Sequence, residues 1–303
     1  MKINKFSEKQ KEIIRFTKDN NRILICDGAV RSGKTMAMSL SFILWAMANF
    51  NDTNFAICGK TVSSAERNIV RPIQTLIQGI FEFKYMISNR CLVITSGKKQ
   101  NFFYFFGGKD ESSYQLIQGL SAGGVLFDEV ALMPKSFVEQ AIARTLSYNN
   151  SKLWFNCNPD SASHWFYKEW IEDRKPKTKH LHFLMEDNPI ITDEEIETAK
   201  KLYTGVFYER YILGRWVTAE GIIFRKFAEE TERYLTDTKD TNINTFSKIT
   251  IGVDFGGTGS LTTFVATGFI GYYQELVVLE EYKIKGENID TLQICEGFID
   301  FYN

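Results

Sequence analysis

The stretch that decides the fold is residues 23–40, which read ILICDGAVRSGKTMAMSL. It begins with a short apolar segment typical of a buried strand, passes through a glycine-rich loop, and ends in an apolar segment long enough for a helix. The loop GAVRSGKT matches the pattern GxxxxGK[ST] without a mismatch. Because a strand precedes the pattern and a helix follows it, the match predicts a phosphate-binding loop.

Each part of this loop has a physical task. The glycines let the backbone curl so that successive N–H groups point at phosphate oxygens, and the following helix adds its positive end. We expect Lys34 to neutralise the β- and γ-phosphates and Thr35 to ligate Mg²⁺, so the loop is predicted to bind ATP with Mg²⁺. The predicted ATP-binding residues of the loop are Gly28, Ala29, Val30, Arg31, Ser32, Gly33, Lys34 and Thr35.

A second apolar segment, residues 124–127, ends in two acids, Asp128 and Glu129. Asp128 would hold Mg²⁺ through water, and Glu129 would polarise the attacking water as a general base. By itself, the pair also fits a strand that ends at a solvated acidic turn. Together with the upstream loop, it predicts that the bound nucleotide is hydrolysed.

Composition narrows the class of protein. The 303 residues, 44% of them hydrophobic, suffice for a sizeable core, and a prior of about 150 residues per domain suggests two domains. The formal net charge of -1 gives no support for nucleic-acid binding, so any DNA contact must be a local patch. Five scattered cysteines without CxxC spacing predict reduced thiols in the cytoplasm. No apolar run is long enough for a membrane span, so no membrane partner is predicted.

Strands alternate with helices up to about residue 170, which predicts an α/β fold with a parallel sheet and helices on both faces. The sequence after this point is rich in charged and polar residues until a new strand begins at Ile249, and an antiparallel meander and a helix follow. We therefore predict a P-loop ATPase core at 1–170, a connecting subdomain and linker at 171–245, and a separate domain at 246–303.

With these motifs in this order, the chain resembles the large terminase subunit of tailed bacteriophages and prophages. The resemblance covers nearly the whole chain and is carried, in order, by GAVRSGKT, FDEVALMP, WFNCNPDSASHWFYKEW, DNPIITDEEIE and YILGRWVTAEGIIF. It implies a RecA/ASCE-like P-loop NTPase followed by the start of an RNase H-like nuclease domain. It also implies an ATP-driven motor that packages double-stranded viral DNA into a procapsid. The expected partners are DNA, the portal protein, the small terminase subunit and further copies in a ring on the portal, within the host cytoplasm.

The resemblance assigns roles residue by residue. Gln10 matches an adenine-contacting glutamine, although a surface helix glutamine is an equal reading. Arg31 would sense the γ-phosphate or act across subunits. Arg144 is a candidate arginine finger for a neighbouring subunit, with a surface arginine as the alternative. Asn156 and Asn158 resemble the coupling motif that passes hydrolysis to movement, and an ordinary turn before proline is the alternative.

Residues 251–259, IGVDFGGTG, have two readings. In the terminase family this strand opens the nuclease, and Asp254 would be the first ligand of two Mg²⁺ or Mn²⁺ ions. The rival is the phosphate-binding turn of actin-like sugar kinases, which the upstream P-loop disfavours. Two-metal chemistry needs about three carboxylates, and only Asp254 is clearly placed. We therefore expect that the nuclease domain is truncated and that this chain alone does not cut DNA.

Two other functions stay open at this stage. A helicase would also use the P-loop, but the sequence after Trp170 offers no second RecA-like series of strands and helices. An inactive remnant would bind ATP and partners without turnover. The pair His180 and His182 is not predicted to bind metal, because no third ligand is evident beside it.

Overall fold

The computed structural model describes residues 6–218, 234–235, 242–256, 261–285 and 291–302. The chain forms two compact units, Met1–Gly221 and Ile222–Asn303. No helix of the described residues is long and apolar enough to cross a membrane.

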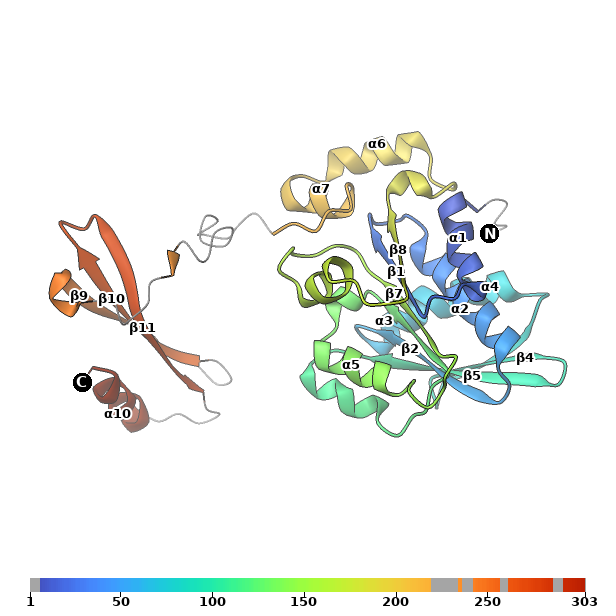
Figure 1. The fold of residues 1–303 in the computed structure, drawn as a ribbon, viewed down its shortest axis with the longest axis horizontal. Helices are drawn as coiled ribbons and strands as arrows, with labels where there is room; N and C mark the ends of the chain where they lie inside the picture. Colours follow the sequence, from blue (N-terminus) through green and yellow to red (C-terminus); the bar gives the residue numbers. More distant parts are fainter. Residues whose placement is uncertain (1–5, 219–233, 236–241, 257–260, 286–290, 303) are drawn as a thin grey trace. The chain divides into compact units, whose positions relative to one another are not determined.

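An eight-stranded sheet forms the centre of the first unit, in the order β3-β4-β5-β2-β6-β7-β1-β8 (Figure 1). Neighbours from β5 to β8 in this order are parallel, whereas β4 runs antiparallel to both β3 and β5. The strands are β1 Ile23–Gly28, β2 Thr53–Gly59, β3 Glu82–Met86, β4 Cys91–Ser96, β5 Lys99–Gly107, β6 Gly124–Asp128, β7 Lys152–Asn156 and β8 Thr178–Phe183.

Helices cover both faces of this sheet. Alternation along β1 sends Leu24 and Cys26 into one core and Ile23 and Ile25 into the other, so neither face is exposed to water. The first core holds α1 Glu8–Arg15, α2 Lys34–Asn49, α3 Val62–Ala65 and α4 Arg71–Ile77; the second holds α5 Lys135–Ala143 and the 3-10 helix Glu111–Ile117. The predicted α/β fold with helices on both faces of the sheet is confirmed, and the sheet is parallel as predicted except at β4.

The sheet differs from the expected one at its two edges. The sequence predicts a hairpin of residues 91–95 and 101–106 around the turn SGKKQ, and β4 and β5 form it. The strand β3 was not predicted, because its pattern EFKYM alternates weakly and faces solvent on one side. At the other edge, β8 pairs with β1. The sheet therefore extends past residue 170, the predicted end of the ATPase core.

Two short helices, α6 Asp193–Leu202 and α7 Gly205–Tyr211, pack against the loop after β1. The contact is apolar: Ala29 of the loop lies in one buried cluster with Ile196 of α6 and Ile212 after α7. Figure 1 shows this pair of helices beyond the end of the sheet at which β1 and β8 finish. The loop is therefore held between the sheet and a small helical layer.

The second unit is an antiparallel sheet in the order β11-β10-β9, with one helix. The elements are β9 Phe246–Asp254, β10 Leu261–Ile270, β11 Glu275–Lys285 and α10 Thr291–Tyr302. The ring of Phe264 on β10 meets Phe298 of α10 edge-on, with 5.6 Å between ring centroids, and Phe264 is fully buried. The described elements match the meander and helix expected from the sequence.

Candidate nucleotide-binding site

The candidate site lies at the carboxyl ends of β1, β6 and β7, where ligands bind in parallel sheets. A cavity of about 480 Å³ opens there. Its lining joins residues that are far apart in the chain, namely Arg31, Ser32, Gly33, Lys34, Thr35, Asn68, Glu129, Asn156, Asn158 and Asn188. Most of the residues singled out from the sequence therefore meet around one space.

The start of the loop is anchored through its backbone. The amide of Ala29 donates to the carbonyl of Phe183 at 2.8 Å, and the amide of Val30 donates to the carbonyl of Tyr211 at 3.0 Å. Gly28 has φ +126°, and a methyl group there would lie 2.0 Å from the carbonyl oxygen of Phe183. Only glycine fits so close to β8. The amides of Ala29 and Val30 are thus already engaged by protein carbonyls.

Lys34 is buried and folded against the loop. Its ammonium donates to the carbonyls of Gly28 at 3.0 Å and Ala29 at 2.7 Å, and to Ser32 Oγ at 3.1 Å. Burial lowers the pKa of Lys34, and the nearby Glu129 carboxylate opposes that effect. The charge of an anion entering the cavity would offset the cost of burying the ammonium, which is the electrostatic basis for phosphate binding.

Thr35, Asp128 and Asn156 form one hydrogen-bonded group. The Asn156 amide donates to Asp128 Oδ1 at 2.7 Å and to Thr35 Oγ1 at 2.8 Å, and Thr35 Oγ1 lies 3.3 Å from the same Asp128 oxygen. Asp128 and Asn156 are 3% and 1% exposed, whereas Thr35 is partly buried and reaches the cavity. The other oxygen, Asp128 Oδ2, accepts from Asn68 at 3.0 Å, a residue that the sequence analysis missed.

Glu129 follows β6 in a left-handed backbone conformation, with φ 60° and ψ 52°. Such a conformation is costly for a residue other than glycine and is concentrated at functional sites. Burial, and then the charge of Asp128, raises the pKa of Glu129. The Asn158 amide donates to Glu129 Oε1 at 3.0 Å, while Asn158 Oδ1 accepts from Lys34 at 3.3 Å. Asn158 therefore links the lysine to the carboxylate.

Gln10 is buried directly behind the loop. Its Oε1 accepts from the backbone amide of Ser7, which completes a capping box at the start of α1. Its Nε2 is buried and has no hydrogen-bond partner in the described structure. That nitrogen would lie 2.4 Å from a methyl group placed on Gly33. An unpaired donor beside the loop fits a ligand with an acceptor edge, as adenine has.

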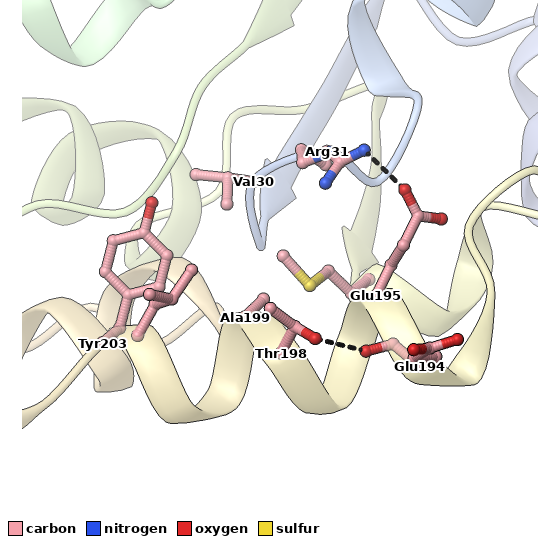
Figure 2. Close-up of a pocket in the computed structure, with 9 residues that line it drawn as sticks. Val30, Arg31, Glu194, Glu195, Thr198, Ala199 and Tyr203 are labelled. Atoms are coloured by element: carbon pink, nitrogen blue, oxygen red, sulfur yellow. Dashed lines mark hydrogen bonds and ion pairs between the residues drawn. The ribbon is translucent and has the colours of Figure 1, made fainter.

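Arg31 lines the candidate cavity, and its side chain is turned toward α6. Figure 2 shows its guanidinium directed at Glu195 of α6, and the two groups form an ion pair of 3.2 Å. Both side chains are half-exposed, so the pair contributes little stability. A cavity of about 280 Å³ adjoins the pair between the loop and α6. The structure thus brings Arg31 to the helical layer above the loop.

Arg144 does not join this site. It caps the carboxyl end of α5, and its carbonyl accepts from the amide of Ala122, just before β6 begins. Asp128 lies at the carboxyl end of β6, so Arg144 is beside the opposite, amino end of the same strand. Its Nε is buried and has no partner in the described part of the chain. Any contact with a nucleotide would have to be made with another copy of the chain.

A second polar cluster lies directly beneath the loop and was not predicted. Asp27, the residue before Gly28, is 1% exposed. Its Oδ1 lies 2.8 Å from His180 Nε2 and 3.0 Å from His182 Nδ1, and its Oδ2 accepts from the Trp216 indole at 2.7 Å. The two histidines thus share a carboxylate on β1, and the described residues contain no group of three or more His, Cys, Asp or Glu side chains that could hold a metal ion.

Asp254 belongs to the second unit, at the end of β9, and is exposed. It is opposite Thr263 of β10, which is opposite Lys283 of β11. Since opposed residues share a sheet face, Glu281 is on the same face as Asp254 but two strands and two residues away.

Comparison with known proteins was consistent with this geometry. A family model described as "Terminase large subunit, T4likevirus-type, N-terminal" matches residues 25–231. The large terminase of a thermophilic bacteriophage is 38% identical, with 98% of this chain and 74% of that chain covered and a TM-score of 0.68. The same terminase in complex with ADP is 37% identical, with the same coverage and TM-score. No curated protein gave a match.

Two more distant structures share the fold alone. The ATPase domain of the large terminase of Thermus phage P74-26 is 18% identical, with 70% of this chain and 94% of that chain covered and a TM-score of 0.56. The large terminase of bacteriophage HK97 is 15% identical, with 92% and 63% covered and the same TM-score.

Proposed function

This chain belongs to the large terminase family, and we propose that it is the ATP-hydrolysing motor subunit that packages double-stranded viral DNA into a procapsid. The observation that carries the hydrolytic part is the convergence of Lys34, Thr35, Asp128 and Glu129 on one cavity. The complex of the thermophilic phage's large terminase with ADP supports nucleotide binding in this family.

The phosphates are proposed to bind to the backbone amides of the loop that are not already bonded to protein carbonyls. Because the amides of Ala29 and Val30 are engaged by Phe183 and Tyr211, the amides from Arg31 to Thr35 are the ones we assign to phosphate oxygens. Lys34 would exchange its loop carbonyls for the β- and γ-phosphates. Gln10 Nε2 is assigned to the adenine, since it is a buried donor without a partner in the described structure.

The residues present also fit Mg²⁺. Thr35 and Asp128 supply the hydroxyl and carboxylate oxygens that this ion prefers, and both lie in the cavity wall or next to it. Asn156 Oδ1 is buried without a partner in the described structure, so it is free to accept from a metal-bound water. The ion, when bound, would neutralise charge on the phosphates.

Glu129 is proposed as the general base. It is held by Asn158, and its raised pKa brings it closer to neutral pH, where a base works best. Asn158 touches both Lys34 and Glu129, so a change at the phosphates reaches the base through a single side chain. We therefore keep Asn156 and Asn158 as the coupling residues.

Further roles concern the assembled motor. Arg31 is proposed to exchange Glu195 for the γ-phosphate, and Arg144 to act on the site of a neighbouring copy in a ring on the portal protein. The small terminase subunit and double-stranded DNA are the other proposed partners, in the cytoplasm of the host.

For the nuclease half, Asp254 is proposed as a metal ligand for Mg²⁺ or Mn²⁺. Two-metal cleavage needs further carboxylates near this position. Among the described residues on this face of the sheet, Glu281 is separated from Asp254 by the strand β10. We propose that this chain alone does not cut DNA. Incubation of plasmid DNA with the protein and Mn²⁺ tests this, and Asp254-dependent nicking would refute it.

The motor function is tested by ATP turnover with and without linear double-stranded DNA. Glu129→Gln should lower kcat by a factor of about 10² to 10⁴, the usual contribution of a general base, while ADP still binds. Glu139→Gln on the exposed face of α5 is the matched control and should leave turnover unchanged. Wild-type protein that binds ATP without turnover would contradict the proposal.

A further inference from the structure

Asn68 lies in the candidate site but belongs to none of its sequence motifs. Its amide donates to Asp128 Oδ2 at 3.0 Å, while the amide of Asn156 donates to Oδ1 of the same carboxylate at 2.7 Å. Each oxygen of the Asp128 carboxylate therefore accepts a hydrogen bond from a neutral amide side chain. Asn68 also lines the cavity, together with Thr35 and Glu129.

The two amides are held very differently. Asn156 ends β7 in the middle of the sheet and is 1% exposed. Asn68 is exposed and sits in a π-helical turn, Glu66–Val70, between α3 and α4. Asn156 is fixed by the sheet, whereas Asn68 depends on the shape of one helical turn.

The sequence explains why the helix widens at this turn. Pro72 has no N–H, so the carbonyl of Asn68, four residues earlier, cannot receive the regular helical hydrogen bond. The proline ring also crowds that carbonyl. The π-helical turn contains this carbonyl, and such turns are frequent at functional sites. On the other side of the turn, Ile69 and Val70 remain buried in the core. The widened turn thus leaves the helix anchored while Asn68 faces Asp128.

We propose that Asn68 is a positioning residue that holds Asp128 in the orientation required for the magnesium site, and that the π-helical turn imposed by Pro72 aims it there. The inference rests on the proposed nucleotide-binding function. Asn68 acts through Asp128, in the way that groups behind a metal ligand orient it, and loss of such groups usually weakens metal binding about 10- to 100-fold.

The test is metal affinity measured apart from turnover. Mn²⁺ binding to the 303-residue chain with saturating ADP is followed by electron paramagnetic resonance. Asn68→Leu keeps a similar volume but removes the donor, and should raise the dissociation constant for Mn²⁺ about tenfold. Asn68→His places a ring N–H within similar reach and should recover most of the affinity. Asn150→Leu, at an exposed turn before β7, is the control and should bind Mn²⁺ as wild type does.

Pro72→Ala gives an independent test, because it keeps the amide of Asn68 and restores the missing N–H. We expect it to close the turn, withdraw Asn68 and weaken Mn²⁺ binding as well. Wild-type Mn²⁺ affinity in Asn68→Leu would overturn the inference while leaving the proposed ATPase intact. Absent ATP turnover in the wild type, with Mn²⁺ affinity still lost in Asn68→Leu, would instead refute the ATPase and support the role of Asn68.

Discussion

The indole nitrogen of Trp216 donates a hydrogen bond of 2.7 Å to Oδ2 of Asp27, across 189 residues of sequence. Asp27 immediately precedes the phosphate-binding loop, and Trp216 follows α7. Burial by itself raises the pKa of Asp27, but the hydrogen bonds from His180 and His182 outweigh it and hold that pKa well below its usual range. The carboxylate therefore stays charged and ties the loop strand to β8 and to the segment after α7.

The bond between Trp216 and Asp27 should contribute measurably to stability. Trp216→Phe keeps an aromatic ring but leaves a charged, buried oxygen without its donor, so we expect a loss of about 1.5–3 kcal/mol in the free energy of unfolding. Urea denaturation measures it. Trp165→Phe is the control for lost ring area, since the Trp165 indole nitrogen donates to no described residue. Equal losses in both variants would show that packing, not the hydrogen bond, matters.

Gln10 should affect nucleotide affinity independently of its part in capping α1. Gln10→Glu preserves the capping-box pattern, because glutamate also suits that position, but removes the unpaired amide donor. We expect the KM for ATP to rise about tenfold, as for the loss of one hydrogen bond worth about 1.4 kcal/mol. Ser7→Ala removes the cap alone and should lower stability by about 1 kcal/mol without changing KM. An unchanged KM in Gln10→Glu would exclude the adenine contact.

The pH dependence of turnover should report on Asn158. As a base, Glu129 works only when ionised, so kcat falls as pH drops through its raised pKa. The hydrogen bonds from Asn158 lower that pKa, so Asn158→Leu should raise it further and move the acidic limb of the kcat profile to higher pH. The limb should stay in place in Asn150→Leu. A limb that stays in place in Asn158→Leu as well would mean that Glu129 is not the titrating group.

Alanine substitutions at two glycines with positive φ, Gly28 and Gly79, distinguish the cost of backbone strain from the cost of a steric clash. Gly28→Ala meets the Phe183 carbonyl at 2.0 Å, and we expect it to cost at least about 3 kcal/mol in stability. Gly79 has φ +82° with open space around it, so Gly79→Ala should cost only the backbone term, about 1 kcal/mol. Thermal and urea unfolding of both variants give the comparison. Similar losses would argue against a tight fit between the loop and β8.

The local parts of the site were predictable because each is written in consecutive residues. A strand, a glycine-rich turn and a helix follow one another from Ile23 to Asn49, so the loop needed no knowledge of the rest of the chain. Asp128 and Asn156 could also be placed at the same edge, because both end buried strands and parallel strands finish at one edge of a sheet.

Other features depended on contacts that spacing does not encode. Asn68 lies within a π-helical turn, four residues before Pro72, and nothing in the neighbouring sequence marks Asp128 as its partner. Arg144 was expected to act on a neighbouring subunit or to be a surface arginine, and only the fold shows that it follows α5 beside the start of β6, away from Asp128 at the end of that strand. The strand β8 and its two histidines reached Asp27 only through the strand order.

The sequence by itself predicted the strand, glycine-rich loop and helix, the acidic pair after β6 and the α/β class, because local backbone preferences and the alternation of apolar residues suffice for these. The resemblance to large terminases rested on specific motifs and their order along the chain. The tertiary structure alone decided which neutral side chains form hydrogen bonds with the charged ones: Asn68 with Asp128, Asn158 with Lys34 and Glu129, and Trp216 with Asp27. Those pairs form because strand order and helix packing bring distant segments within hydrogen-bonding distance, where a buried carboxylate must find donors to remain charged.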